Sequence, residues 1–264
     1  MDYIVNNEDK IRLISFISFL ILFFLVELFF SKFKRNKITY KRWFINFAFI
    51  FIDNILLRIL FPILAVGLAM ICNKNNIIIF NILNIPIIIE FILTFIILDF
   101  GIWLQHLTFH KVKFLWNFHK IHHSDEEVDF TTGIRFHPGE IIISMLYKMF
   151  LVVLIGPSIA LIIIFEVILN ATSLFNHSNI NIQYYLDNYL RKIIVTPNMH
   201  RIHHSVKERE TNSNFGFNFS IWDKLFGTYI DKPKFSEKFV LGLNEFNNST
   251  KKGLLFLLIN PFHK

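Results

Sequence analysis

The chain has a single cysteine in 264 residues, and this residue, Cys72, lies within an apolar segment. One cysteine excludes a disulfide within the chain and a metal site built from several thiolates, so we interpret Cys72 as a small buried hydrophobic residue. The G-x-G-x-x-G motif of dinucleotide-binding folds and the H-E-x-x-H motif of zinc hydrolases are also missing. The chain therefore carries no flavin or nicotinamide site of its own, and any metal it binds must use other ligands.

The formal net charge is +7, but a nucleic acid is not the partner that this charge indicates. The basic residues flank apolar segments and are not interleaved with aromatic residues in the way that nucleic-acid surfaces are. Anionic lipid headgroups are the partner that this arrangement favours.

Long apolar segments dominate the sequence, in which 53% of the residues are hydrophobic. A helix of about 20 such residues crosses the hydrocarbon core of a bilayer. The candidate spans are residues 13–30, 44–70, 77–105 and 141–175. The last is long enough for two helices folded back at Gly156 and Pro157, a pair that turns the chain. The sequence thus predicts an all-α integral membrane protein with four or five transmembrane helices.

The first two spans have features that bear on their topology. Residues 13–30 lack the small-residue cleavage site of a signal peptide, so we expect a retained anchor. The second span contains Asp53 and Arg58, and charges inside a membrane usually face the interior of the bundle or form pairs. A bent or re-entrant segment is the alternative for that span.

Eight of the 11 histidines fall into three clusters beside the apolar segments. One cluster reads H-x-x-x-H, and the motif H-x-x-H-H occurs twice, as H-K-I-H-H-S and H-R-I-H-H-S. Residues three and four apart share a helix face, so each cluster is expected to aim its imidazoles at one point. Packed together without a metal, these side chains would oppose each other's protonation and destabilise the fold at mildly acidic pH. We therefore interpret the clusters as metal ligands: His106 and His110; His119, His122 and His123; His200, His203 and His204.

Eight imidazoles exceed the needs of one ion. About four ligands fill a tetrahedral zinc site, so this number predicts two metals with room left for water or oxygen. Imidazole binds iron, zinc, copper and nickel alike, and the ligands alone do not choose among these metals.

All three clusters are predicted to lie on one side of the membrane. The first two clusters follow the third span without a further crossing, and the hairpin at 141–175 returns the chain to the same side. By the positive-inside rule, the basic loop after the first span stays cytoplasmic, and two more crossings bring the histidines to that side. We expect a cytoplasmic cap of ligand-bearing helices. The basic residues of the loop are Lys32, Lys34, Arg35, Lys37, Lys41 and Arg42.

An ordered series of longer motifs occupies residues 95–230. They are D-F-G-I-W-L-Q-H-L-T-F-H, L-W-N-F-H-K-I-H-H-S-D-E-E, R-F-H-P-G-E, F-N-H-S-N, T-P-N-M-H-R-I-H-H-S and N-F-G-F-N-F-S-I-W-D-K-L-F-G-T-Y. In this order the chain resembles the integral-membrane fatty acid hydroxylase and sterol desaturase superfamily, whose members carry one His-x-x-x-His and two His-x-x-His-His boxes. The motifs look most like the sterol desaturase branch that includes alkylglycerol monooxygenase.

The resemblance implies a metal centre of two iron ions that uses O2 and electrons to hydroxylate or desaturate a lipid. The lipid would be a sterol, a fatty acyl chain or an alkylglycerol-like molecule. The resemblance adds His177 to the eight ligands above, and it makes His137 either a ligand or a residue that supports one. The electrons would come from a separate donor protein, or from a pterin if the likeness to alkylglycerol monooxygenase extends to the reductant.

Asp99 is the candidate for orienting a ligand. A metal-bound histidine usually donates its other ring N–H to a carboxylate or a carbonyl. Asp99 lies seven residues before His106, about two helical turns away on the same face. The alternative is an acid that reaches water at a helix end.

Two other functions fit a histidine-rich membrane protein. A metal transporter would place its ligands at mid-membrane, whereas here they lie at the ends of spans, and a zinc-dependent membrane hydrolase would need the general base of H-E-x-x-H. We divide the chain into anchor helices (1–94), a catalytic region (95–230) and a tail (231–264). The tail's apolar stretch, 254–259, is too short to span the membrane and is expected to lie in the interface.

Overall fold

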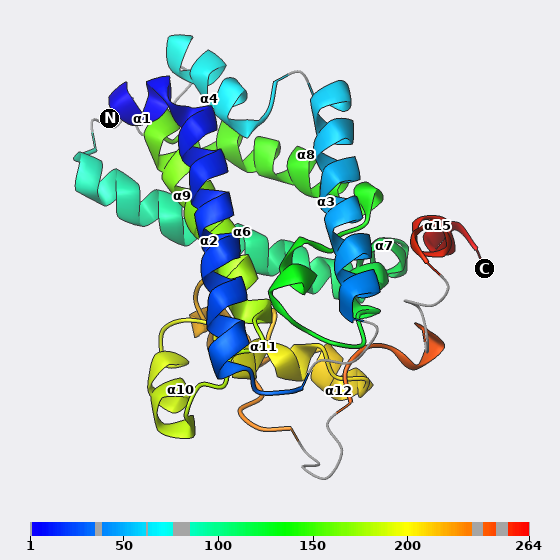
Figure 1. Ribbon diagram of the computed structural model, residues 1–264. Helices are drawn as coiled ribbons and strands as arrows, with labels where there is room; N and C mark the ends of the chain where they lie inside the picture. Colours follow the sequence, from blue (N-terminus) through cyan, green and yellow to red (C-terminus); the bar gives the residue numbers. More distant parts are fainter. Residues whose placement is uncertain are drawn as a thin grey trace.

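The computed structural model describes residues 2–34, 39–61, 63–75, 85–233, 240–246 and 253–263, and this part of the chain is helical apart from isolated bridge pairs. Five stretches are long and apolar enough to cross a membrane. They are α2 (Glu8–Phe30), α3 with α4 (Thr39–Lys74), α6 (Ile87–Lys111), α8 (Pro138–Ile155) and α9 (Ile159–His177). The structure confirms the predicted all-α, multi-pass membrane protein (Figure 1).

The second and third spans differ in detail from the sequence prediction. Helix α3 (Thr39–Leu60) ends before α4 (Ala65–Lys74) begins, so the segment expected at 44–70 is interrupted, as the bent alternative requires. Helix α6 begins at Ile87, directly after Pro86, which presets the backbone for a helix start. Residues 77–84, expected to open the third span, lie outside the described residues.

The hairpin between α8 and α9 is built as predicted. Gly156 closes α8 with a φ of 60°, a left-handed conformation that glycine adopts at little cost. Glu90 of α6 accepts a hydrogen bond from the backbone N–H of Ser158 at 2.7 Å, at the start of α9. The acid within the third span is thus used to bind the free N–H of a helix end.

Helix α9 is the centre of the bundle and packs against α2, α4, η1 (Phe130–Ile134) and α11 (Pro197–His203). Glu27 of α2 is buried and accepts hydrogen bonds from the backbone N–H groups of Phe130 and Asn179, both at 2.8 Å. A carboxylate within an apolar helix therefore ties that helix to η1, which lies between α7 and α8, and to the segment directly after α9.

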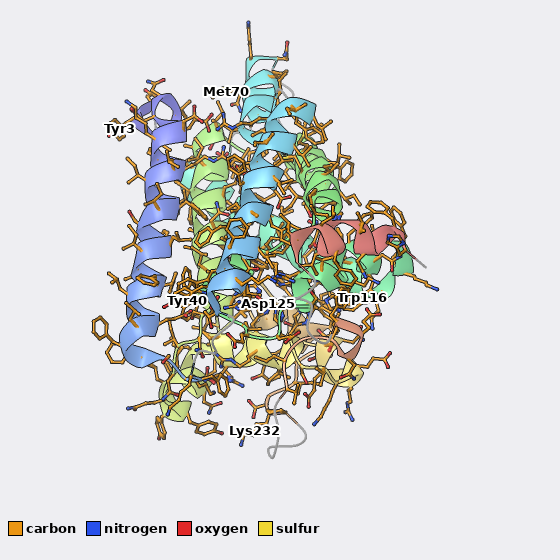
Figure 2. All side chains as sticks on the ribbon, turned by 45° about the vertical axis from the view of Figure 1, so that its right-hand side comes forward. Tyr3, Tyr40, Met70, Trp116, Asp125 and Lys232 are labelled. Carbon is orange, nitrogen blue, oxygen red and sulfur yellow. The ribbon has the colours of Figure 1, made fainter. Side chains whose placement is uncertain are left out.

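Short helices form a cap over one end of the bundle; in Figure 1, α10, α11 and α12 lie below the long helices, and α7 and α15 lie at the right, beside the lower half of α3. Figure 2 shows Tyr3 and Met70 at the opposite end, with Tyr40 and Asp125 toward the cap. The last described segment, with α15 and η3, packs against α7. The cap helices are α7 (Lys113–His123), η1, α10 (Tyr184–Leu190), α11, α12 (Glu208–Thr211), α13 (Ile221–Leu225), η2 (Asn244–Phe246), α15 (Leu254–Ile259) and η3 (Asn260–Phe262); α1 (Asp2–Asn6) precedes α2.

The connection between α2 and α3 lies on the cap side. Lys32 donates to the Asn198 side chain at 2.6 Å, and Arg42 is fully buried in ion pairs with Asp125 and Asp129. Arg42 is therefore a structural residue of the cap and not an exposed charge of the basic loop. Arg35 and Lys37, also assigned to that loop, lie outside the described residues. The basic loop and the histidines share a side, and the cytoplasmic location of that side stays a prediction.

Replacing Gly133 with alanine is expected to loosen η1 from α9. A Cβ atom here would lie 2.8 Å from the carbonyl oxygen of Ser173, an oxygen that also contacts His177 Nδ1 at 2.7 Å. Overpacking of this kind costs about 1–3 kcal/mol of stability. The midpoint of thermal unfolding in detergent should fall, and it should fall by more than in the matched Gly67→Ala variant, whose new methyl group would lie 3.0 Å from a side-chain methyl of Ile63 and near no backbone carbonyl. Equal midpoints for the two variants would contradict the packing argument.

Candidate metal centre

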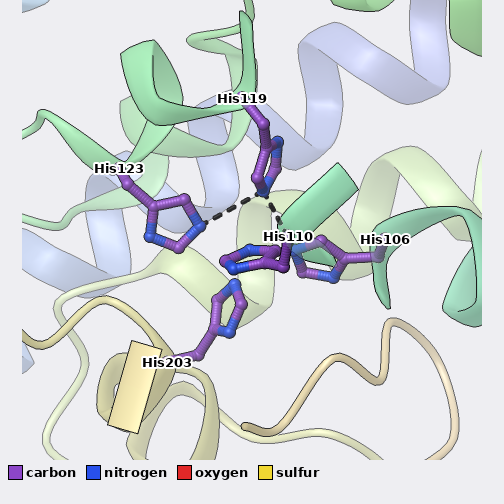
Figure 3. A group of neighbouring side chains, drawn as sticks. All are labelled: His106, His110, His119, His123 and His203. Carbon is purple, nitrogen blue, oxygen red and sulfur yellow. Dashed lines mark hydrogen bonds between the residues drawn. The ribbon is translucent and has the colours of Figure 1, made fainter. Parts of the chain in front are cut away.

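Four helices bring nine histidines together in the interior of the cap. His106 and His110 come from α6, the second cluster from α7, His177 from the end of α9, and the third cluster from α11 and its C-cap. They form two groups, and within each group one ligand atom per side chain lies within 4.8 Å of all the others. The first group, drawn in Figure 3, is His106, His110, His119, His123 and His203; the second group is His122, His177, His200 and His204.

The two H-x-x-H-H motifs contribute to both groups. His119 and His123 belong to the first group and His122 to the second, while His200 and His204 belong to the second and His203 to the first. The prediction that each motif aims all its imidazoles at one point is therefore wrong. Adjacent residues of a helix with 3.6 residues per turn point about 100° apart, so the third and fourth positions after the first histidine diverge.

Five of the histidines have Nδ1 within hydrogen-bond distance of an oxygen, which is a backbone carbonyl for four of them and a Glu140 carboxyl oxygen for His119. A carbonyl can only accept, so Nδ1 of those four carries the proton and Nε2 presents a lone pair to the interior, and an ionised Glu140 selects the same tautomer in His119. The contacts are His106 to the Phe215 carbonyl (2.8 Å), His119 to Glu140 Oε1 (2.7 Å), His122 to the Arg135 carbonyl (3.0 Å), His177 to the Ser173 carbonyl (2.7 Å) and His203 to the Ser213 carbonyl (2.7 Å).

These tautomers place lone pairs face to face. The Nε2 atoms of His106 and His119 are 3.2 Å apart, and those of His122 and His177 are 3.0 Å apart. Neither member of such a pair has a proton to share, so each contact is repulsive unless a cation lies beside both nitrogens. Two nitrogens about 2.1 Å from one ion and at a right angle are about 3 Å apart, so the spacing fits a metal in each group.

Unpartnered ring nitrogens lead to the same conclusion. Both nitrogens of His110 and of His204 are buried and have no hydrogen-bond partner among the described residues, and neither does Nε2 of His203. Leaving a buried polar atom unsatisfied costs about 1–3 kcal/mol. A metal ion in each group would satisfy these atoms.

Burial keeps the histidines of the cap neutral. Desolvation lowers the pKa of His119 to about 3. It also lowers the pKa values of His122, His123, His200, His203 and His204 well below the ordinary value, and the neighbouring imidazoles add to the effect. Neutral imidazole is the form that binds a metal.

Glu140 is the functional residue that sequence reasoning missed. It lies in the first turn of α8, is buried, and contacts His119 Nδ1 at 2.7 Å. The sequence did contain one signal for this residue, its place in R-F-H-P-G-E. Pro138 marks a helix start, and the N-terminal end of a helix stabilises an acidic side chain in its first turn. Nothing in the local sequence shows that α8 crosses α7 at His119.

Asp99, the candidate for orienting His106, contacts no histidine. It accepts hydrogen bonds from Asn218, Phe219 and Trp222, so it anchors the segment that follows the third histidine cluster. Two helical turns are about 11 Å, which is beyond the reach of an aspartate side chain.

His106 is oriented instead by the Phe215 carbonyl. Asp223 fixes that segment, because its carboxylate accepts from the backbone N–H groups of Phe215 and Gly216 at 2.8 and 2.7 Å. The indole of Trp103 also donates to Asp223, at 3.1 Å. Burial raises the pKa of Asp223, and the hydrogen bonds that it accepts oppose the rise.

His137 lies outside both groups. Its Nε2 contacts the Leu258 carbonyl at 2.9 Å, and its Nδ1 accepts from the Gly139 N–H at 3.0 Å, so both ring nitrogens are in use. The structure therefore assigns it to the start of α8 and to the contact with the C-terminal segment.

A cavity of about 840 Å³ reaches both groups. Its lining includes His106 and His119 from the first group and His122, His177 and His200 from the second, together with Glu140. The other lining residues are mainly apolar, with Phe47, Ile50, Phe109, Ile134 and Phe136 among them. This volume and lining suit a hydrophobic ligand of the size of a lipid chain.

Comparison with known proteins gives consistent matches. A family model described as fatty acid hydroxylase matches residues 91–228, just over half of the chain. The ornithine lipid hydroxylase OlsE of Rhizobium tropici is 28% identical over 179 residues, which are 68% of this chain and 52% of the relative. Human alkylglycerol monooxygenase is 30% identical over 154 residues, 56% of this chain and 32% of the relative. The Caenorhabditis elegans alkylglycerol monooxygenase is 32% identical over 136 residues, 50% of this chain and 25% of the relative.

The chain thus spans about half the length of the first of these relatives and a third or less of the others. No solved structure matches it. The matched region contains every member of the two histidine groups and overlaps the catalytic region predicted at 95–230.

Proposed function

Because the chain belongs to the fatty acid hydroxylase family, we propose that it is a membrane-bound, O2-dependent di-iron enzyme that hydroxylates a lipid. The observation that carries the proposal is that two buried histidine groups line one apolar cavity in a multi-pass membrane protein. The relatives named above are a hydroxylase and monooxygenases, which favours hydroxylation over desaturation. Ornithine lipids and alkylglycerols are the substrate classes that their names suggest.

The nine histidines of the two groups are the proposed ligands, five for one iron and four for the other. When bound, the two irons supply the activation of O2 and the oxidation of a C–H bond. One oxygen atom enters the product as a hydroxyl and the other leaves as water, with the electrons and protons supplied by a donor outside this chain. A donor protein or a pterin is proposed, since the sequence has no dinucleotide-binding motif.

The residues around the ligands hold the imidazoles in place and exclude water. The ring of Phe215 lies 5.1 Å from that of His110, Trp116 lies 4.8 Å from His110, and Phe136 stacks on His122 at 4.6 Å. Carbonyls and Glu140 fix the tautomers, so the ligand geometry is set before a metal or substrate arrives. An aromatic shell of this kind lowers the local polarity and protects reactive oxygen chemistry from solvent.

The test is an oxygen-labelling experiment on the full chain. Iron-loaded protein in lipid nanodiscs, supplied with a reductant and isotopically labelled O2, should produce a hydroxylated lipid that carries the label. The His200→Ala, His203→Ala variant should produce none. Zinc as the bound metal, or a product oxygen that derives from water, would contradict an oxygenase and favour a hydrolase.

A further inference from the structure

The cavity also has a charged end, formed by residues that belong to neither histidine group. Its lining there includes Arg12 of α2, Asp53 and Arg58 of α3, Lys148 of α8 and Glu166 of α9. Charged side chains within membrane helices are costly and usually mark a binding site or form pairs. Neither group of ligands uses any of these five residues.

Ring contacts between the helices show how far from the cap this charged end lies. Phe23 of α2 packs on Phe175 of α9 with centroids 6.0 Å apart, and Phe24 packs on Trp43 of α3 at 5.9 Å. Counting away from the cap from these contacts, α2 reaches Arg12, α3 reaches Asp53 and α9 reaches Glu166 at about the same depth. Glu166 precedes the ligand His177 by 11 residues, about 16 Å along the helix.

On one wall of the charged end, two cations share one carboxylate. Glu166 accepts from Lys148 at 2.7 Å and pairs with Arg12 at 3.1 Å, and its side chain is 4% exposed. Arg12 also approaches Glu8 at 3.4 Å. Two cations and two carboxylates thus form a network on this wall, and the N–H groups of Lys148 and Arg12 that Glu166 does not use can donate to an anionic group of a ligand.

Asp53 supplies an acid to the same end of the cavity. It is 5% exposed, and its Oδ1 atom has no hydrogen-bond partner among the described residues. A buried carboxylate without a partner is costly, so Asp53 is held neutral until a cation or a hydrogen-bond donor of a ligand reaches it. The cavity therefore presents cations on one wall and an unpartnered acid on another.

We propose that this charged end binds the zwitterionic headgroup of the lipid substrate, with its ammonium at Asp53 and its acidic group at Lys148 and Arg12. The hydrocarbon chain then extends through the apolar part of the cavity to the histidines. An uncharged glycerol ether would leave Asp53 without a partner. The inference rests on the proposed function, since it takes the substrate to be a lipid. It further specifies that oxidation occurs on the hydrocarbon chain of the lipid, at a position set by the length of the cavity.

Binding is tested with three probes of equal chain length and the full-length, iron-loaded protein in detergent micelles. The probes are an Nα-acyl-ornithine, which is zwitterionic; its δ-N-acetyl derivative, which is anionic; and a 1-O-alkylglycerol, which is neutral. The zwitterionic probe should bind at least about tenfold more tightly than either of the others, since charge-assisted hydrogen bonds at both walls are then formed. Equal affinities for the three probes would overturn the proposal.

Four variants separate the charged end from the general fold. Asp53→Asn and Lys148→Met should each weaken binding of the zwitterionic probe by about tenfold, whereas Lys148→Arg should retain most of it. Lys10→Met, an exposed cation on α2 that does not line the cavity, should bind as the parent does. Asp53→Asn keeps the shape of the side chain, so parent-like binding by this variant would overturn the assignment.

The iron content and the product distinguish this inference from the proposed function. All four variants should retain the iron content of the parent, because none of the altered residues contacts a histidine. Labelled hydroxyl on the hydrocarbon chain, located by fragmentation in mass spectrometry, supports the headgroup position, and hydroxyl on the headgroup overturns it. A zwitterion preference without any O2-dependent product would overturn the proposed function while supporting the charged end as a lipid site.

Discussion

Replacing His110 with alanine is expected to lower the iron content from about two ions to about one per chain. His110 belongs to the first group alone, and the matching variant of the second group is His204→Ala. Neither side chain makes a hydrogen bond within the described structure, so each substitution removes a ligand without breaking a hydrogen bond. Either variant should lose more than about a hundredfold of the hydroxylation rate, because loss of even a supporting partner costs 10–100-fold.

Elemental mass spectrometry of freshly purified protein measures this result. His137→Ala is the matched control, because His137 is a histidine of the same region that belongs to neither group, and it should retain both irons. Loss of iron in His137→Ala, together with a full complement in His110→Ala, would contradict the two-group assignment.

Glu140→Gln is expected to weaken metal binding in the first group by about 10–100-fold and to lower the rate accordingly. The carboxylate contacts His119 Nδ1 at 2.7 Å, and its negative charge raises the basicity of the ligating Nε2. Glutamine keeps the size of the side chain and removes this charge. The second group, in which the Arg135 and Ser173 carbonyls hold His122 and His177, should retain its iron.

Chelator competition on the variant protein resolves the two ions. The control is Glu208→Gln, which makes the same change in an exposed acid on α12. This variant should lose both irons at the same chelator concentration as the parent protein does. If Glu140→Gln released both irons at one chelator concentration, or released both at the concentrations that the parent requires, the carboxylate would not be the group that supports His119.

Much of the fold follows from local pattern. The apolar runs, the hairpin at Gly156 and the ends of the spans that carry histidines are all visible in the sequence, because the cost of exposing polar backbone to lipid forces helices there. The sequence did not decide whether the span is broken between α3 and α4, since nothing local distinguishes a bent span from a straight one. Asp53 and Arg58 were expected to face the bundle interior or to form pairs: Asp53 is buried and lines the cavity, whereas Arg58 lines it but is exposed.

The partners of the ligands could not be found in this way. Asp99 was chosen because it shares a helix face with His106, but its carboxylate is used by Asn218, Phe219 and Trp222, more than 100 residues away. Glu140 supports His119 only because α8 crosses α7. Contacts between distant segments depend on packing, and packing leaves no periodic signal in a single sequence.

The sequence by itself determined that this protein is a helical membrane protein with a histidine-rich metal centre, because hydrophobic length and imidazole chemistry are properties of the residues. The tertiary structure decided the rest. It divided the H-x-x-H-H motifs between two groups, since adjacent residues on a helix point in different directions and each meets a different neighbour. It also enclosed one cavity between the histidines and a set of charges contributed by α2, α3, α8 and α9, which lie together only when the helices pack.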